Sequence, residues 1–443
     1  MLKSDRWARI TILGGGREVG RAAYLVESTD GNVLLDCGVD VSTGNTPYLE
    51  LLNVEDLSAV VLSHAHLDHS GMLPYLMRMG YDNPIYMTRP TFDITSLLLE
   101  DMLKIAYNED KDLPFSKGDV KRMKKNTYIL EYYEDCEIDP DITLNLFSAG
   151  HILGSAMAYL KFSKFSVLYT GDFNYDSTRL LDPADSNIPD VNTVLIEGTY
   201  GSKDDKRPSR KKLEQMLTQD ILKTLKNGGK VIIPAFAVGR SQEMLLFLKD
   251  IFTSLNLEYE IYVDGMIWEA SKIYSKYSKY LKDSVWKREG NPFLSKDFIR
   301  VRGKKREDCV NIDYPSVIVT TSGMLTGGPI LHYLEHLGGD ARNSLYLVGY
   351  QAEGTLGRKI LDGKREIEIN GKKIELNLEV KWFHFSSHSD RNALIRFVRD
   401  VMNKTDEFVI VHGEERKVLE FAEYIEKRKS VKTPKNVESV RII

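Results

Sequence analysis

Apolar positions along the chain gather in short runs, most of them the length of a strand rather than of a helix. Residues 9–13, 22–27 and 32–36 alternate or run apolar in the way that is typical of strands. A further run, at residues 57–62, comes directly before the first helical pattern, at residues 72–79. A chain that opens with several strands favours a sheet built mainly from hairpins with helices packed outside it, and we predict an α/β fold of this kind.

Three later strands share a pattern in which an apolar run is followed by one polar side chain close to a glycine. They are predicted at residues 143–147, 165–169 and 194–196, and the polar side chains beside them are His151, Asp172 and Glu197. Clefts are commonly built in this way, with polar groups converging at one end of a sheet. The pattern therefore predicts a functional site at that end.

The chain changes character near residue 202, where a charged, turn-like segment gives way to regular alternation of strands and helices. A helix is predicted at residues 209–226, with leucine and isoleucine side chains four residues apart along one stripe. The alternation is typical of a parallel α/β module, and after it the strand pattern of the first part returns. We predict one sheet-rich domain with an insertion, bounded as residues 1–202 and 363–443 for the sheet-rich domain and 203–362 for the insertion.

Composition narrows the class of protein. The 443 residues suffice for two or three domain-sized cores, and the formal net charge of −4 gives no general attraction to nucleic acid. The three cysteines lie far apart, which predicts neither a disulfide framework nor a Cys-x-x-Cys metal site. Residues 1–10 lack the apolar stretch of a secretion signal, and no apolar run approaches the ~20 residues of a membrane span. We therefore expect a cytoplasmic protein without a membrane partner, in which any binding of RNA or DNA uses local patches.

Histidine is scarce in the chain, yet three of its nine histidines fall within one stretch of six residues. His64, His66, Asp68 and His69 occupy the bend between a predicted strand and the first predicted helix. His64 and His66 are two residues apart, so they point the same way in an extended segment. Imidazole and carboxylate groups together suit a divalent first-row metal, zinc above all. Four such side chains exceed what one tetrahedral site needs from one loop, which indicates two adjacent ions.

Asp36 ends the predicted strand at residues 32–36 and is followed by Cys37 and Gly38. An acid in this place is a common turn former. It can equally orient a metal-bound histidine by accepting a hydrogen bond from that ring's other nitrogen. The residues alone leave both interpretations open.

These motifs resemble the metallo-β-lactamase fold, in which His-x-His-x-Asp-His is followed by a further histidine, an aspartate and a final histidine. The segments around Glu197 (Glu-Gly-Thr-Tyr-Gly), His388 (Ser-Ser-His-Ser-Asp) and His412 (Val-His-Gly-Glu) are similar to the three extra motifs of its β-CASP branch. The resemblance spans essentially the full length and points to archaeal homologues of the endonuclease subunit of cleavage and polyadenylation specificity factor, with bacterial ribonuclease J more distant. It implies an αββα sandwich with an inserted β-CASP α/β domain.

The resemblance also implies roles for single residues, beginning with two zinc ions per chain. The implied ligands are His64, His66 and His151 for one ion and Asp68, His69 and His412 for the other. Asp172 would bridge the two ions, and Asp36 would be the acid that orients a ligand. Glu197 and His388 would form a pair over the scissile phosphate and, together with Asp68, make up the catalytic residues.

Contacts to the substrate are predicted at four further residues. Arg240 follows Gly239 at the start of a predicted helix, where anions are favoured, and is a candidate phosphate contact. Ser322, Ser386 and Ser387 carry hydroxyl groups that can donate to phosphate oxygens.

Three remaining histidines are interpreted as structural. His332 and His336 share one helix face at i, i+4, but a pair of this spacing without a third ligand is more often structural. His384 lies between two phenylalanines and is assigned to the core or the surface.

The implied function is zinc-dependent hydrolysis of RNA phosphodiester bonds by a two-metal mechanism, in RNA 3′-end processing, transcription termination or RNA decay. Endonucleolytic cleavage and 5′→3′ exonucleolytic trimming of the ribonuclease J type both stay open. The competing hypotheses are a metal-dependent hydrolase of a small ester, thioester or lactam, which needs no inserted domain, and a scaffold subunit, which would have lost ligands.

RNA is the expected partner, with RNA-processing or transcription machinery as a further one. A homodimer is also expected, and the apolar end at residues 440–443 is its candidate contact. Because the predicted sheet starts within the first ten residues, we expect none of the RNA-binding KH modules that some archaeal relatives carry ahead of the catalytic part.

Overall fold

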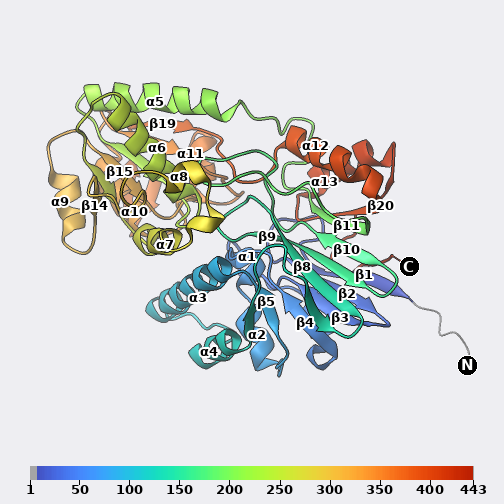
Figure 1. The fold of residues 1–443 in the computed structure, drawn as a ribbon. Helices are drawn as coiled ribbons and strands as arrows, with labels where there is room; N and C mark the ends of the chain where they lie inside the picture. Colours follow the sequence, from blue (N-terminus) through green and yellow to red (C-terminus); the bar gives the residue numbers. More distant parts are fainter. Residues whose placement is uncertain (1–6, 443) are drawn as a thin grey trace, which may run out of the picture. The chain divides into compact units, whose positions relative to one another are not determined.

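The computed structural model describes residues 7–442 and divides the chain into two compact units. One unit comprises Met1–Lys206 and His388–Ile443, and the other is Arg207–Ser387. The chain thus leaves the first unit once and returns to it near its end (Figure 1). Among the described residues, no helix is long and apolar enough to cross a membrane.

Two seven-stranded sheets form the first unit. The strands of one sheet, in spatial order, are β22 (Ser439–Arg441), β1 (Ala8–Gly14), β2 (Ala23–Ser28), β3 (Gly31–Leu35), β4 (Leu57–Val61), β5 (Ile85–Met87) and β6 (Thr127–Ile129). Those of the other are β21 (Ser430–Lys432), β20 (Thr405–Val411), β11 (Val191–Glu197), β10 (Ser166–Tyr169), β9 (Ala156–Phe162), β8 (Ile142–Ser148) and β7 (Cys136–Asp139). The sheets pack face to face, because alternate side chains of each, such as Ile10 and Leu160, enter one shared core.

Helices cover the outer face of each sheet. Those of the first unit are α1 (Leu67–Ser70), α2 (Leu73–Arg78), α3 (Arg89–Asn108), α4 (Lys117–Lys125), α12 (Arg391–Val401) and α13 (Glu415–Glu426). Leu34 on the outer face of the first sheet packs with Leu76 of α2. Leu168 of the second sheet packs in one cluster with Phe397 of α12 and Phe421 of α13. The layers run helix, sheet, sheet, helix, so the predicted αββα sandwich is confirmed.

The second unit is built on a six-stranded parallel sheet with helices on both faces. Its strands, in spatial order, are β14 (Phe298–Arg300), β13 (Ile261–Val263), β15 (Val317–Thr320), β12 (Val231–Pro234), β16 (Ser344–Leu347) and β19 (Glu379–Trp382), with β17 (Glu366–Ile369) and β18 (Lys372–Glu375) as a separate hairpin. Its helices are α5 (Arg210–Lys226), α6 (Arg240–Ser254), α7 (Ile267–Tyr274), α8 (Asp283–Trp286), α9 (Lys305–Asn311), α10 (Pro329–Leu337) and α11 (Leu356–Leu361). The predicted stripe on α5 is buried and packs with β12 and α6.

The return to the first unit comes later than the sequence places it. The predicted boundary lies at residue 363, whereas the structure keeps the chain with the second unit up to Ser387. The reason is that β19 pairs in parallel with β16, and Leu376 packs in the same core as α10. Short apolar strands look alike in both units, so periodicity alone does not assign a strand to a sheet.

The apolar C-terminal end is used inside its own unit. β22 pairs antiparallel with β1, and Val440 enters the core between the two sheets, with Ile442 packed against it. Ile443 lies outside the described residues. A homodimer stays a prediction, but Val440 and Ile442 no longer provide its basis.

Candidate active site

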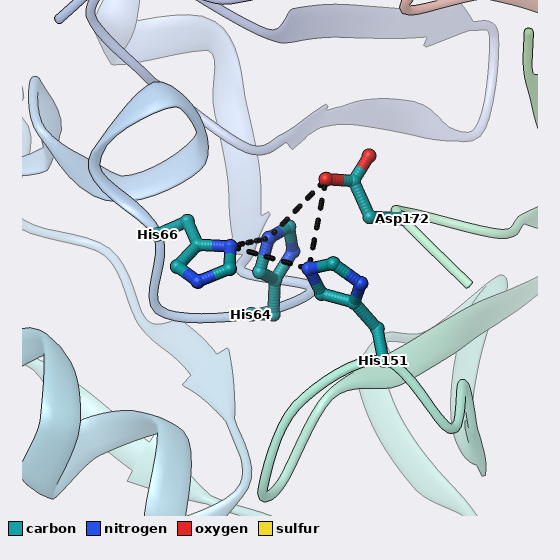
Figure 2. Close-up of side chains that lie close together, drawn as sticks. All are labelled: His64, His66, His151 and Asp172. Atoms are coloured by element: carbon teal, nitrogen blue, oxygen red, sulfur yellow. Dashed lines mark hydrogen bonds and ion pairs between the residues drawn. The ribbon is translucent and has the colours of Figure 1, made fainter. Parts of the chain in front are cut away.

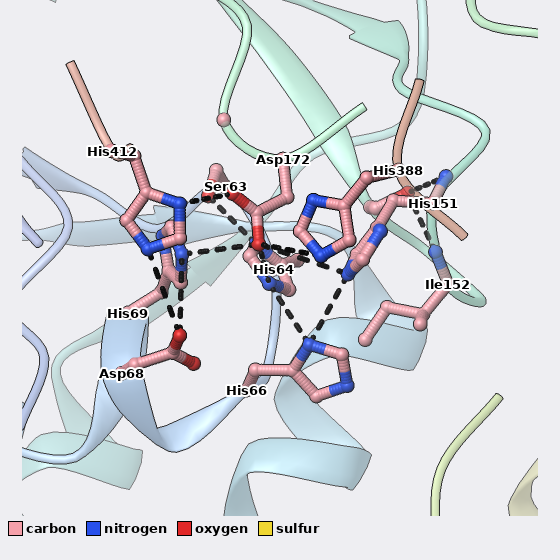
Figure 3. Close-up of polar contacts among 12 residues, drawn as sticks. Ser63, His64, His66, Asp68, His69, His151, Ile152, Asp172, His388 and His412 are labelled. Carbon is pink, nitrogen blue, oxygen red and sulfur yellow. Dashed lines mark hydrogen bonds and ion pairs between the residues drawn. The ribbon is translucent and has the colours of Figure 1, made fainter. Parts of the chain in front are cut away.

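The predicted metal ligands all lie in the first unit, at the ends of strands of both sheets. His64 and His66 follow β4, Asp68 and His69 belong to α1, and the other three follow strands of the second sheet. His151 lies between β8 and β9, Asp172 follows β10 and His412 follows β20. Figure 3 shows these side chains converging from separate segments of the chain.

The first ligand group consists of three imidazoles. The Nδ1 atom of His66 lies 3.2 Å from Nε2 of His64 and 3.2 Å from Nε2 of His151 (Figure 2). Two nitrogens bound to one tetrahedral zinc ion lie about 3.3 Å apart. Asp172 Oδ2 lies 3.6 Å from His64 Nε2 and 3.9 Å from His151 Nε2. The four atoms therefore have the spacing of ligands around one ion.

The second ligand group consists of Asp68, His69 and His412. Asp68 Oδ2 lies 4.0 Å from His69 Nε2 and 3.7 Å from His412 Nε2. Asp172 reaches this group too, with its Oδ2 atom 3.3 Å from His69 Nε2. One carboxylate thus lies against both groups, which is where a bridging ligand belongs (Figure 3).

Two buried atoms show that these residues fit a metal. His69 Nε2 and Asp172 Oδ1 make no hydrogen bond of good geometry in the described part of the chain; the 2.9 Å contact between Asp172 Oδ1 and His412 Nδ1 is an ion-pair distance only. Buried polar atoms are rarely left unpaired, so such atoms need an explanation. A divalent cation coordinated by imidazole nitrogens and carboxylate oxygens supplies it.

The pKa values of the ligand set show that its carboxylates act strongly on the neighbouring imidazoles. Burial and the neighbouring ring of His69 lower the pKa of His64 well below its usual range. Burial alone would lower the pKa of His412, but the Asp172 carboxylate outweighs it and raises that pKa to about 10. Asp172 likewise overcomes burial and raises the pKa of His69. Without a cation, the carboxylates thus hold protons on nearby rings, and metal binding would displace them.

Asp36 lies behind His69. Its Oδ2 atom is 2.7 Å from His69 Nδ1, which donates to it, so that Nε2 of the same ring is turned toward Asp68 and Asp172. Asp36 is fully buried and has a positive φ of 60°, a backbone conformation that aspartate tolerates better than most residues. The contact favours the orienting interpretation over that of a plain turn former.

Two residues that the sequence did not single out complete this contact. Ser63 donates to Asp36 from both its backbone nitrogen and its hydroxyl, each at 2.7 Å. The hydroxyl of Tyr169, at the end of β10, donates to Asp36 Oδ2, also at 2.7 Å. Only a weak signal for these two contacts was present in the sequence. Ser63 directly precedes the histidine motif and Tyr169 is the last residue of a strand, and neither position by itself indicates a contact with Asp36.

Glu197 and His388 form the pair that the resemblance implies. His388 Nδ1 donates to Glu197 Oε2 at 2.9 Å, and the other carboxylate oxygen of Glu197 accepts from the backbone nitrogen of Phe173 at 2.8 Å. His388 Nε2 lies 3.8 Å from Asp172 Oδ2. Burial alone would lower the pKa of His388, but Glu197 outweighs it and raises that pKa. The carboxylate of Glu197 thereby favours the protonated form of the ring beside the ligand groups.

The predicted substrate contacts lie in the second unit and have partners there. Arg240 is 4% exposed, forms an ion pair with Glu243 and donates to the hydroxyl of Ser387 at 3.2 Å. The Ser322 hydroxyl donates to a backbone carbonyl of its own loop at 3.0 Å, and Ser386 is half-buried. Arg240 thus has partners inside its own unit, and its contact with phosphate stays a prediction.

Close backbone packing holds α1 against the end of β3, and Gly38 permits it. A Cβ atom on Gly38 would lie 1.7 Å from the carbonyl oxygen of Asp68. We expect Gly38→Ala to displace α1, to lower the metal content and to destabilise the fold by about 1–3 kcal/mol, as overpacking does. Thermal unfolding and metal analysis of the purified variant measure both effects. Gly118→Ala in α4 is the matched control, since the nearest atom to its Cβ is 3.4 Å away, and equal behaviour of the two variants would contradict the prediction.

Fold and site together define a metallo-hydrolase, and comparisons with known proteins place it in a family. The model of the metallo-beta-lactamase superfamily matches residues 16–224, that of the Beta-Casp domain 241–360, and that of the Zn-dependent metallo-hydrolase RNA specificity domain 373–437. The chain belongs to the β-CASP branch of the metallo-β-lactamase superfamily, which confirms the resemblance seen in its sequence.

Archaeal proteins resemble the chain over nearly its whole length. Transcription termination factor FttA of Methanocaldococcus jannaschii is 42% identical, with 100% of this chain and 73% of the relative covered. The proteins of the same name from Pyrococcus abyssi and Lokiarchaeum sp. are 42% and 41% identical, over 99% and 98% of this chain and 72% and 71% of theirs. A crystal structure of a protein of unknown function from Enterococcus faecalis shares the fold, with a TM-score of 0.57, 13% identity, and coverage of 98% of this chain and 100% of that one.

Proposed function

We propose that this protein is a zinc-dependent ribonuclease that cuts RNA internally and serves in transcription termination. The observation that carries the proposal is the position of His388, whose Nε2 lies 3.8 Å from Asp172 while its Nδ1 donates to Glu197. A proton donor held beside a two-ion ligand set suits phosphodiester hydrolysis, because the leaving oxygen needs a proton. The relatives named as transcription termination factors support the pathway, and the match to an RNA specificity domain supports RNA as substrate.

Seven side chains would hold the two ions. They are His64, His66 and His151 for one ion, Asp68, His69 and His412 for the other, and Asp172 between them. When bound, the ions activate water for attack on phosphorus and offset the charge that develops on the phosphate oxygens. Asp36 keeps the Nε2 atom of His69 turned toward the centre by accepting the hydrogen bond from Nδ1.

The protein's own proton chemistry rests on His388 and Glu197. Because Glu197 accepts the hydrogen bond from Nδ1, the Nε2 atom of His388 is the one that would give its proton to the leaving group. The backbone of Phe173 fixes the carboxylate from the other side. The proton passes from Nε2 to the 3′ oxygen as the P–O bond breaks, which leaves a 3′ hydroxyl on one product and a 5′ phosphate on the other.

Hydrolysis of a small ester, thioester or lactam is the competing function. The same ligand groups would serve it, and so the ligands alone do not distinguish the two. A small substrate, however, requires no second unit built on a six-stranded sheet of its own. The size of that unit favours a polymeric substrate.

Cleavage of one RNA labelled separately at its 5′ and 3′ ends tests the proposal. We expect discrete internal products from both labels, and elemental analysis of the same sample should find at least two zinc ions per chain. Asp68→Ala is expected to lose cleavage and zinc together. If nucleotides are instead released progressively from the 5′ end, the proposed internal cleavage is wrong and the enzyme is a 5′→3′ exoribonuclease. Bound zinc without cleavage of any RNA would overturn the ribonuclease in favour of the small-molecule hydrolase.

A further inference from the structure

The second unit carries a cluster of possible ligands of its own, on α9 and α10. Glu307, His332 and His336 each offer one ligand atom, and these atoms all lie within 4.8 Å of one another. The sequence interpretation made the two histidines structural because it found no third ligand. The fold supplies that ligand, since α9 brings Glu307 beside them.

The hydrogen bonds of His336 fix which ring nitrogen is available. Its Nδ1 atom lies 2.8 Å from the backbone carbonyl of His332, one helical turn earlier. A carbonyl only accepts, so Nδ1 carries the hydrogen, and the Nε2 atom of the neutral ring is left with a bare lone pair. A neutral imidazole in this form is a metal ligand.

His332 contributes a ring nitrogen that makes no hydrogen bond to any described residue. Its Nε2 atom is buried without a hydrogen-bond partner within residues 7–442, and the nearest carboxylate oxygen, Glu307 Oε1, is 3.7 Å away. That separation is too long for a hydrogen bond. Two ligand atoms bound to the same first-row ion lie about 3 Å apart or slightly more, so the separation of His332 Nε2 and Glu307 Oε1 is close to that distance. The rings of His332 and His336 lie with their centroids 4.2 Å apart, on the same face of α10.

A buried network one residue away sets the register of the two helices. Asp264, after β13, accepts two hydrogen bonds from the guanidinium of Arg306, at 2.6 and 2.9 Å, and one from the hydroxyl of Tyr333, at 2.8 Å. Arg306 directly precedes Glu307, and Tyr333 directly follows His332. The hydrogen bonds of Asp264 therefore fix α9 and α10 relative to each other. The three possible ligands are held close together by these bonds and need no contacts among themselves. Arg306, the adjacent cation, is also kept in an ion pair with Asp264 and so opposes a bound metal less.

We propose that Glu307, His332 and His336 form a binding site for one divalent first-row cation, zinc in the first instance. Two imidazoles and one carboxylate are a ligand set that zinc and its neighbours accept, with water in the remaining positions. Two histidines at i, i+4 on a helix bind zinc in the same manner in His-Glu-x-x-His proteins. The site belongs to the second unit and uses none of the ligands assigned to the catalytic centre. A metal there would tie α9 to α10.

The test compares metal content of purified full-length variants after removal of all metal and dialysis against micromolar Zn²⁺ or Co²⁺. His336→Ala and the isosteric Glu307→Gln are each expected to bind one ion per chain fewer than the wild type, or to bind that ion at least ~10-fold more weakly. His384→Ala, which removes another histidine of the same unit, is the matched control and should retain it. His336 and Glu307 are exposed, so neither change threatens the fold, and thermal melting verifies this.

The readout is the difference between variant and wild type, so it does not depend on how many ions the catalytic centre holds. RNA cleavage by His336→Ala should equal that of the wild type, which separates this site from the proposed ribonuclease centre. Equal metal content and equal Co²⁺ spectra in wild type and both variants would overturn the proposal. So would an additional ion that binds only at millimolar metal, as adventitious surface binding does.

Discussion

Replacing His388 by alanine is expected to slow RNA cleavage by about 10²–10⁴-fold, the range that a positioned general acid contributes. The zinc content should stay at the wild-type level, because His388 lies outside both ligand groups. The physical reason for the loss is the hydrogen bond from Nδ1 to Glu197, which leaves Nε2 as the atom that can deliver a proton beside Asp172. Without it, the 3′ oxygen would leave as an alkoxide or take its proton from water.

A substrate with a better leaving group distinguishes proton donation from mere positioning. The p-nitrophenolate ion leaves without a proton, so His388→Ala should cleave bis-p-nitrophenyl phosphate at a rate much closer to that of the wild type than its rate on RNA. His384→Ala, four residues earlier in the chain, serves as the matched control and should affect neither substrate. An equal loss on both substrates would show that His388 positions the phosphate rather than protonating the leaving group. Loss of zinc would instead assign it to the metal site.

Much of the candidate site was predictable because strand ends can be identified from the sequence. His151, Asp172 and Glu197 are far apart along the chain, yet each comes at or just after the end of a strand, and those strands, β8, β10 and β11, belong to one sheet. A sheet brings such positions to a common edge whatever the length of chain between them. The two-residue spacing of His64 and His66 adds a local signal, because it predicts that both rings point the same way. Hydrophobic periodicity and motif spacing together therefore predicted which of these side chains the fold brings together.

Hydrogen bonds between side chains that are distant in sequence could not be predicted from the sequence. Tyr169 looks like an ordinary strand tyrosine until the fold places its hydroxyl 2.7 Å from Asp36. Asp36 itself allowed two interpretations, and only the position of His69 on the opposite segment favours one of them. In the same way, the helix start at Arg240 predicts an anion contact, whereas the hydrogen bond from its guanidinium to Ser387, far along the chain, is visible only in the folded unit.

Contacts between segments far apart in sequence account for the other differences. The last strand of the second unit, β19, has the same alternating pattern as strands of the first unit, and only its pairing with β16 assigns it. Glu307 precedes His332 by a strand and a loop, so no spacing rule connects it to the His332–His336 pair. These contacts follow from tertiary packing, which local pattern does not encode.

Replacing Asp172 by asparagine is expected to have the largest effect of any single change at the site. Asp172 lies against both ligand groups, and the neighbouring imidazoles outweigh burial to keep its pKa well below the usual range, so it presents a carboxylate at neutral pH. Asparagine keeps the shape and removes the charge. We expect cleavage to fall by at least ~10³-fold, because several kcal/mol of charge stabilisation by the bound ions would be lost. The zinc content should fall in parallel.

Thermal melting with and without a chelator connects this loss to metal binding. A ligand that binds only the folded state stabilises it by about 2.7 kcal/mol when its concentration is 100 times the dissociation constant. Chelation should therefore lower the melting temperature of the wild type markedly and that of Asp172→Asn much less. Asp176→Asn is the matched control, since Asp176 is exposed in the same loop and forms an ion pair with Arg396, and it should behave as the wild type does. Full zinc content in Asp172→Asn, with an undiminished response to chelator, would mean that the ions are held without this carboxylate and that the bridging role is wrong.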